Sequence, residues 1–243
     1  MSDGPDFYDD DAVFAAYAAG RARPDNPNDT LERPALLELI GDMAGLRVLD
    51  LGCGDAAFGR EALERGAAAY TGVEGSRNMV AAARSALAGT PGTAVQSTIE
   101  GWSYPPDTFD LAVSRLALHY VADFAAVLAG VHRALSAGGR LVCSVEHPVI
   151  TSCARGWESG TLRQDWVVDD YFASGRRETN WMGGRVVKYH RTVDDYFGEM
   201  QRAGFTVEQL REARPRPEHF ADPATYARRM RIPLFLIIAG RRA

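Results

Sequence analysis

The chain has 243 residues, of which 46% are hydrophobic and 24% charged, the proportions of an ordinary globular protein. This length fits one large α/β domain, or a compact domain with a modest insertion. No apolar run reaches 18 residues, which argues against a transmembrane helix and a membrane partner. The acidic beginning, MSDGPDFYDDD, lacks the apolar segment of a signal peptide, so we expect a cytoplasmic protein.

The cysteines and the charged residues exclude further classes. Three cysteines, Cys53, Cys143 and Cys153, have no paired spacing, which argues against a disulfide framework, a zinc knuckle or an iron–sulfur cluster. We therefore expect no metal site. The net charge of −5 disfavours a broad nucleic-acid surface. Only Lys188 of the 27 basic residues is a lysine, which we attribute to codon bias, and Schiff-base chemistry has little support.

The first 40 residues are expected to form a small helical cap. Phe7, Phe14 and Tyr17 lie near helical spacing, and residues 21–29, RARPDNPND, predict a loop. A helix over residues 31–40 follows, with Asn28 or Asp29 near its start.

Residues 45–149 alternate regularly between strands and helices and predict the core. Apolar strands are expected at 47–52, 69–74, 93–98, 109–115 and 140–146, and helices at 58–65, 76–88 and 123–135. Strands that are apolar on both faces and alternate with helices favour a parallel, doubly wound sheet.

The pattern stops after Val149. Residues 150–191 show no clear period and hold three of the four tryptophans, which favours an inserted substrate lid. Regularity returns with a helix at 192–203, capped by Thr192, and strands at 205–212 and 232–240. We thus expect a single α/β domain over residues 1–243: a doubly wound, mostly parallel seven-stranded sheet with a cap and a lid.

The segment VLDLGCGD, residues 48–55, joins the first strand to the first helix. Gly52 and Gly54 allow a tight turn and let a ligand lie against the main chain, beside the free N–H groups of the helix N-terminus. Glu74 ends the second strand 20 residues after Gly54, where a carboxylate can accept hydrogen bonds from a ribose diol. These features predict a site for a nucleoside-containing cofactor.

Two details argue against a dinucleotide. The next glycine, Gly59, comes too late for the G-x-G-x-x-G fingerprint. Asp50, Asp55 and Glu74 in one crevice would repel a pyrophosphate, whereas Asp50 suits a ligand with a cationic amino-acid moiety.

With these features the chain resembles a class I S-adenosylmethionine-dependent methyltransferase, of the small-molecule type with an N-terminal helical cap. VLDLGCGD is similar to the family's first motif and GVEGS, residues 72–76, to its second. Residues 95–121 resemble its adenine-binding turn, fourth strand and following loop, so that the similarity covers residues 47–146 and, more loosely, the final helix and two strands.

The resemblance implies S-adenosyl-L-methionine as the cofactor and a Rossmann-like fold. The position that contacts the adenine is often Asp in the family and is Thr98 here, whose hydroxyl can bind the adenine amine. The Ile99 amide can bind a ring nitrogen of the adenine, and Glu100 is an alternative source of the missing carboxylate. Tyr17 and Arg21, one helical turn apart, can close over the methionine end, or simply pack as a helix. The expected cofactor residues are Tyr17, Arg21, Asp50, Gly52, Cys53, Gly54, Glu74, Gly75, Ser76, Thr98, Ile99, Glu100 and Ser114.

Methyl transfer from a sulfonium needs a well-placed acceptor, and a base only if the acceptor must lose a proton. The candidates for catalysis are His119 after the fourth strand, and Glu146 and His147 after the fifth. His119 is alternatively structural, and Glu146 is as suited to binding a polar or cationic acceptor as to acting as a base. Pro148 favours an extended backbone at His147, which we expect to aim its imidazole into the pocket.

Aromatic residues of the lid are expected to bind the acceptor by stacking, or alternatively only to fix the lid to the core. His190 and Arg191 have the same two interpretations. The expected substrate residues are Trp157, Trp166, Tyr171, Trp181, Tyr189, His190 and Arg191, with Phe172 among the same aromatic set.

The sequence thus predicts transfer of a methyl group to a small organic acceptor at O, N or C, such as an aromatic or natural-product-like metabolite. The alternatives are a methyltransferase that acts on tRNA or protein, and a cofactor-binding protein without transfer activity. The acidic charge disfavours RNA, and SRLALHY after the fourth strand differs from the Asn-Pro-Pro-Tyr type that suits a nucleobase or a glutamine amide. The expected partner is a small-molecule methyl acceptor and not a nucleic acid.

Overall fold

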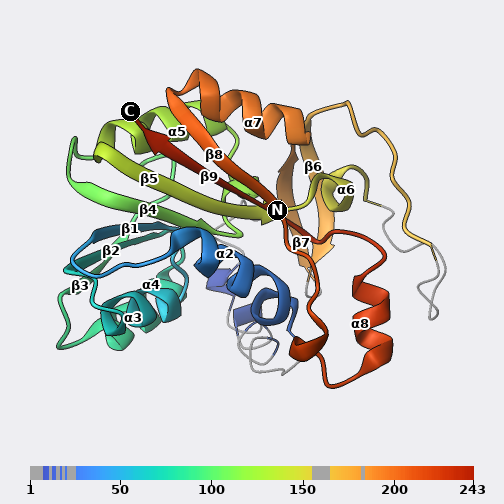
Figure 1. Cartoon of the computed structure of the whole chain (residues 1–243), viewed down its shortest axis with the longest axis horizontal. Coiled ribbons are helices and arrows are strands. Elements are labelled where there is room, and N and C mark those ends of the chain that lie inside the picture. The colour runs from blue at the N-terminus through green and yellow to red at the C-terminus, as the bar shows by residue number, and fades with distance from the viewer. Residues whose placement is uncertain are drawn as a thin grey trace.

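A seven-stranded sheet forms the centre of the computed structural model, which describes residues 8–10, 13, 14, 17, 20, 26–154, 165–181 and 184–243 (Figure 1). The strand order is β3-β2-β1-β4-β5-β9-β8. The first five strands pair in parallel, whereas β9 runs antiparallel to both β5 and β8. The prediction of a doubly wound, mostly parallel sheet is confirmed. The strands are β1 Arg47–Leu51, β2 Ala69–Glu74, β3 Gly92–Gln96, β4 Phe109–Arg115, β5 Leu135–Glu146, β8 Phe205–Glu212 and β9 Phe235–Arg242.

Helices cover both faces of this sheet. In Figure 1, α2 (Arg33–Ile40), α3 (Ala57–Glu64) and α4 (Arg77–Leu87) lie below the sheet, and α5 (Phe124–Ala134) and α7 (Val193–Arg202) lie above it. Each layer has its own core of buried apolar side chains: Leu36 and Phe58 belong to the first, Leu128 and Met200 to the second. A π-helical segment, η2 (Asn28–Glu32), leads directly into α2 where a helix from residue 31 was expected.

Local sequence signals explain where the helices begin. The Ser76 side chain accepts a hydrogen bond from the Met79 amide at the start of α4, and Asp123 does the same for Ala126 at the start of α5. Thr192 and Asp195 form a reciprocal capping box at α7, which confirms the predicted cap.

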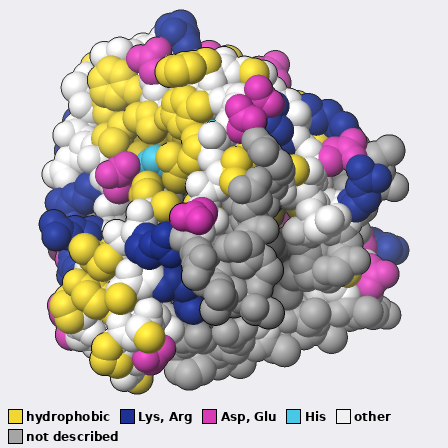
Figure 2. All heavy atoms as spheres, turned by 90° about the vertical axis from the view of Figure 1, so that its right-hand side faces the viewer, with side chains coloured by type: hydrophobic (Ala, Val, Ile, Leu, Met, Phe, Trp, Pro, Cys, Tyr) yellow, Lys and Arg dark blue, Asp and Glu magenta, His cyan; other side chains and the backbone are white. Residues whose placement is uncertain are grey.

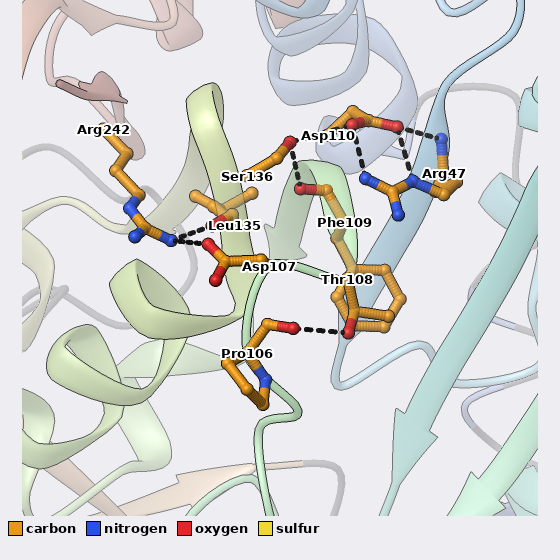
Figure 3. Close-up of polar contacts among 9 residues, drawn as sticks. All are labelled: Arg47, Pro106, Asp107, Thr108, Phe109, Asp110, Leu135, Ser136 and Arg242. Carbon is orange, nitrogen blue, oxygen red and sulfur yellow. Dashed lines mark hydrogen bonds and ion pairs between the residues drawn. The ribbon is translucent and has the colours of Figure 1, made fainter.

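A polar cluster fastens β1 to β4 at the end of the sheet remote from the carboxyl ends of the strands. The backbone amide and Nε of Arg47 donate to Asp110 Oδ2 at 3.0 and 2.9 Å, and Nη2 donates to Oδ1 at 2.8 Å (Figure 3). The Ser136 hydroxyl donates to Asp110 Oδ1 at 2.8 Å. These bonds make Asp110 a structural carboxylate.

The insertion after β5 is more regular than its sequence suggested. It begins with a short helix, α6 (Pro148–Thr151), and contains an antiparallel hairpin, β6 (Gly175–Trp181) and β7 (Gly184–His190). The expectation of an irregular segment is wrong for these two strands, since the β7 side chains Val186, Lys188 and His190 are buried against the core. The signal for this hairpin was the adjacent glycines at 183 and 184.

The segment between β8 and β9 contains a short turn, η4 (Pro217–His219), and a helix, α8 (Pro223–Arg229), that the sequence analysis did not anticipate. Asp222 caps α8 by accepting from the Ala224 and Thr225 amides. Within the described ranges, no helix has the length and apolar character needed to cross a membrane.

Candidate active site

A cavity of about 380 Å³ opens where the parallel strands end, at the edge where sequence reasoning placed the cofactor. Of the expected cofactor residues, those that line it are Tyr17, Asp50, Gly52, Cys53, Gly54, Glu74, Gly75 and Ile99. The cavity continues past the ends of β4 and β5 to a second group of side chains. This group contains Arg115, Leu116, His119, Tyr120, Glu146, Ile150, Arg229, Leu234 and Phe235.

The turn after β1 is shaped by its glycines. Gly52 has a φ of +74°, and a Cβ there would lie 2.3 Å from the Ala117 Cβ, so only glycine fits. Gly54 has a φ of +56°, and a Cβ there would meet nothing within 4 Å, which leaves space for a ligand against the backbone. The turn thus forms a cradle on one wall of the cavity.

Glu74 is fixed beside this turn. Its Oε2 accepts from the Gly54 amide at 3.0 Å, and its Oε1 accepts from the Ser76 amide at 2.9 Å. Each carboxylate oxygen can accept a further bond, so both remain able to accept from a pair of hydroxyl groups. Burial raises the pKa of Glu74, while the backbone hydrogen bonds oppose that effect.

Asp50 supplies an unsatisfied buried acceptor. Its Oδ2 accepts from the Tyr70 hydroxyl at 2.6 Å, whereas Oδ1 is buried with no hydrogen-bond partner in the described part of the chain. Burial raises the pKa of Asp50 to about 7, against the opposing effects of Tyr70 and Arg115. A cationic ligand group next to Oδ1 would satisfy this oxygen and favour its charged form.

Tyrosines form another part of the cavity wall. Tyr8 and Tyr17 meet edge to face with ring centroids 5.2 Å apart, and the Tyr8 hydroxyl is hydrogen-bonded to Tyr120. Burial raises the pKa of both Tyr8 and Tyr120 well above the ordinary value. Arg21, which was expected beside Tyr17, lies outside the described residues.

Glu146 and Lys188 form a buried ion pair at the far end of the cavity. Lys188 Nζ lies 2.6 Å from Glu146 Oε1 and 5.8 Å from the centroid of the Tyr120 ring. Burial is the largest single effect on Glu146 and would raise its pKa. The charges of Lys188 and His119 and the hydrogen bond from Lys188 together outweigh burial, so the pKa is lowered. The chain's only lysine therefore has a defined place in the structure, which composition had not indicated.

His119 is held by the backbone of the next strand. Its Nδ1 accepts a hydrogen bond from the Glu146 amide at 3.3 Å, which places the proton of the neutral ring on Nε2. Burial lowers the pKa of His119 to about 4. Its imidazole is thus neutral near pH 7, and the nitrogen that is not held by the backbone is a donor.

Arg115 also lines the cavity, and sequence reasoning did not single it out. Its Nε and Nη2 lie 3.2 and 2.5 Å from the two carboxylate oxygens of Glu32, which is fully buried. The Ser144 hydroxyl donates to Glu32 Oε1 at 2.7 Å. Glu32 comes from the π-helical segment η2, 83 residues earlier in the chain, so no local pattern pointed to this pair.

Four expected cofactor residues have other roles outside the cavity wall. Glu100 Oε1 accepts from the Ala122 and Asp123 amides at the start of α5. Thr98 Oγ1 accepts from the Gly101 amide. Ser114 donates to the Leu51 carbonyl, and Ser76 caps α4.

His147 faces away from the cavity. Its Nδ1 accepts from the Val149 amide as the N-cap of α6, and its Nε2 lies 3.0 Å from Glu212 Oε1. Burial lowers the pKa of His147, and Glu212 opposes that shift. The extended backbone before Pro148 was predicted correctly, but it directs the imidazole toward α6 and β8 and not into the pocket.

The described side chains expected to bind substrate make contacts within the insertion and, for Arg191, to the core. Trp166 Nε1 donates to the Val149 carbonyl at 2.8 Å, and His190 bridges the Thr151 hydroxyl and the Tyr171 carbonyl at 2.8 Å each. Arg191 donates to the carbonyls of residues 121 and 122. None of these described side chains lines the cavity.

The remaining aromatic residues of the insertion divide between surface and contact positions. The guanidinium carbon of Arg191 lies 5.9 Å from the centroid of the Tyr189 ring. Phe172 lies at the surface and is 90% exposed. Hydrophobic side chains also gather on part of the face that Figure 2 turns toward the viewer. Trp157 and the side chain of Trp181 lie outside the described part of the structure.

Comparisons with known proteins agree with this architecture. Residues 49–143 match the methyltransferase domain family. A crystal structure of an S-adenosylmethionine-dependent methyltransferase from Mesorhizobium loti is 38% identical, with a TM-score of 0.81, and the match covers 92% of this chain and 100% of that one. A putative S-adenosylmethionine-dependent methyltransferase from Listeria monocytogenes is 31% identical, also with a TM-score of 0.81, over 94% and 99% of the two chains.

An uncharacterized protein of Haemophilus influenzae is 33% identical over 215 residues, which cover 84% of this chain and 85% of the relative. The fold and the glycine turn define a Rossmann-like methyltransferase. The chain belongs to the class I S-adenosylmethionine-dependent methyltransferases, and S-adenosyl-L-methionine is its cofactor. When bound, this cofactor supplies a methyl group on a positively charged sulfur.

Proposed function

We propose that this methyltransferase acts on a small organic molecule, at N, O or C, that binds beside Glu146, His119 and Tyr120. One observation carries the proposal. A single cavity contains both the glycine turn after β1 and this polar group at the ends of β4 and β5. An acceptor seated among these side chains would share one cavity with the cofactor, as direct transfer requires.

The walls of the acceptor end favour a small molecule over a macromolecule. This end is bounded by Ile150 of α6, Leu234 and Phe235 near the start of β9, and Arg229 of α8. The whole cavity, cofactor end included, has a volume of about 380 Å³, in the range of small-molecule sites. The charged residues that line it are four acids and two arginines: Asp50, Asp55, Glu74, Glu146, Arg115 and Arg229. This balance disfavours tRNA, whose phosphates need a basic surface.

We assign roles to the cofactor-binding residues from the same geometry. Glu74 accepts from the ribose hydroxyls, and the free Oδ1 of Asp50 faces the cationic amino-acid end of the cofactor. Ile99, a hydrophobic lining residue, contacts the adenine, while Tyr17 covers the methionine end. Thr98 and Glu100 are not needed in this arrangement, because their acceptor oxygens already serve the backbone.

The test has two stages. Calorimetry with S-adenosylmethionine measures binding, and mass spectrometry then follows methyl transfer to a panel of small amines, phenols, alcohols and indoles. We expect binding and at least one methylated product. Binding without any product would support a cofactor-binding protein, and methylation of added tRNA or protein in place of the small molecules would support the macromolecular alternative.

A further inference from the structure

We propose that the acceptor is a small amine, recognised by the Glu146 carboxylate that Lys188 holds in place, and that the methyl group is transferred to nitrogen. This inference rests on the proposed small-molecule activity and specifies its acceptor. Three observations carry it: the geometry of the Glu146–Lys188 pair, the absence of a suitable base among the described residues at the acceptor end, and the aromatic walls around the carboxylate.

The Glu146–Lys188 pair joins two distant parts of the chain at the acceptor end. Glu146 ends β5, and Lys188 comes from β7 of the inserted hairpin, 42 residues later. Glu146 lines the cavity and uses Oε1 for the 2.6 Å contact with Lys188 Nζ, while Lys188 stands behind it, buried and outside the cavity wall. A charged carboxylate oxygen, Oε2, is thereby left to accept a hydrogen bond from an acceptor.

At the acceptor end of the cavity, Glu146 and His119 offer no strong base to a substrate that reacts through a hydroxyl group. The Nδ1 of His119 is taken by the Glu146 amide, and its Nε2 carries a proton. The lowered pKa of Glu146 makes its carboxylate a weak proton acceptor but a good partner for N–H groups. An alcohol or neutral phenol needs a base before it can attack, and an anionic oxygen would be repelled by Glu146. An alkylammonium ion, with a pKa of about 10, can lose its proton to solvent without a base in the site, and the neutral amine then has its lone pair available.

The charge balance of the reaction also favours an amine here. The acceptor nitrogen uses its lone pair to form the N–CH3 bond while the methyl–sulfur bond breaks, and sulfur keeps that electron pair. Positive charge therefore moves to the nitrogen. An amine that arrives protonated first loses its proton to solvent. In the overall reaction, RNH3⁺ and the sulfonium are therefore converted to RNH2CH3⁺, the neutral thioether and H⁺.

The surroundings of Glu146 suit such a cation. Tyr120 and Phe235 line the cavity next to it, and Phe235 is the register partner of Glu146 across β5 and β9. Aromatic side chains are a recurrent part of sites that bind ammonium groups. The nearby positive charge of Arg115 is paired with Glu32 and so does not oppose this role.

The first experiment compares matched acceptors. Benzylamine, phenethylamine and tryptamine are offered to the full-length protein with S-adenosylmethionine, alongside benzyl alcohol, phenethyl alcohol and tryptophol, and fragmentation spectra locate the methyl group. We expect methylated amines and no methylated alcohols. Methylation on oxygen or carbon as the main reaction would overturn the amine proposal but leave the small-molecule function standing. A bound cofactor with no product from this panel or the wider one would overturn both.

The second experiment changes the pair itself. With the best amine of the panel, E146Q is expected to lower kcat/KM about tenfold or more, mainly through KM, because the charged partner of the amine is lost. K188M is expected to do the same, and K188R to recover most of the activity. S-adenosylmethionine affinity should stay unchanged in all three variants, which separates this role from cofactor binding.

A matched control comes from the same hairpin. Glu178 on β6 is paired with Arg176 and Arg185 at the surface, so E178Q should leave the amine kinetics unchanged. Calorimetry supplies a readout other than turnover: benzylamine should bind the protein loaded with S-adenosylhomocysteine about tenfold more weakly in E146Q than in the unchanged protein. Equal binding in both proteins, with both folded by circular dichroism, would overturn the recognition role of Glu146.

Discussion

Replacement of Glu74 tests the assigned cofactor site most directly. Its carboxylate accepts from the Gly54 and Ser76 amides and is proposed to accept two ribose hydroxyls as well. A hydrogen bond to a charged group contributes about 1.5 kcal/mol or more, so loss of two is worth about 3 kcal/mol, or about 100-fold in Kd. We expect Glu74→Ala to weaken S-adenosylmethionine binding by at least about tenfold, since solvent partly replaces the lost partner.

Titration calorimetry measures this effect on the Kd. Two further variants show whether a change in Kd comes from the lost hydrogen-bond acceptors of Glu74. Glu74→Gln keeps the size of the side chain but offers an NH2 where a second acceptor is needed, so it should also weaken binding. Thr98→Ala is the control, because Thr98 lies outside the cavity wall and its hydroxyl is hydrogen-bonded to the Gly101 amide. We expect its Kd to change less than about threefold. An unchanged Kd for a folded Glu74→Ala protein would refute the assignment.

Three further predictions concern packing and charge. Gly52→Ala should weaken cofactor binding and lower the thermal midpoint, because a positive φ and a clash with the Ala117 Cβ cost about 1–3 kcal/mol. Glu32→Gln should lower the free energy of unfolding in urea by about 3–5 kcal/mol, since it leaves the largely buried Arg115 without its charged partner. Arg47 holds the pKa of Asp110 well below its usual range, so this carboxylate stabilises the fold above about pH 4 and that contribution is lost as the pH falls toward its folded pKa. Asp110→Asn should therefore flatten the acid side of the stability profile, as measured by urea unfolding between about pH 2 and 5.

Each of these has a matched control. Gly41 has the same φ of +74° but open space at its Cβ, so Gly41→Ala isolates the backbone strain from the clash at Gly52. Glu38→Gln removes an exposed partner of Arg216 and should cost about 1 kcal/mol or less. Asp107→Asn changes another carboxylate near β4 (Figure 3). Its stability should depend on acid pH in the same way as that of the parent protein. A Glu32→Gln protein as stable as Glu38→Gln, or an Asp110→Asn profile identical to that of the parent, would contradict the respective argument.

The sequence by itself was sufficient to locate the proposed cofactor end of the cavity. The turn at Gly52 and Gly54 and the acid at Glu74 are local features whose spacing follows from one strand–turn–helix–strand unit. Parallel strands bring their carboxyl ends to the same edge, so their positions along the chain were sufficient to bring them together. The same logic correctly placed Glu146 at this edge, after β5.

Only the tertiary structure decided what lies opposite the cofactor. His147 and Glu146 are neighbours in sequence, yet the start of α6 and Glu212 hold His147 outside the cavity while Glu146 faces it. The sole lysine became informative only when the hairpin placed it 2.6 Å from Glu146. The physical reason is that a strand or turn is specified by interactions between near neighbours, whereas a buried ion pair depends on the packing of segments dozens of residues apart, which no local pattern encodes.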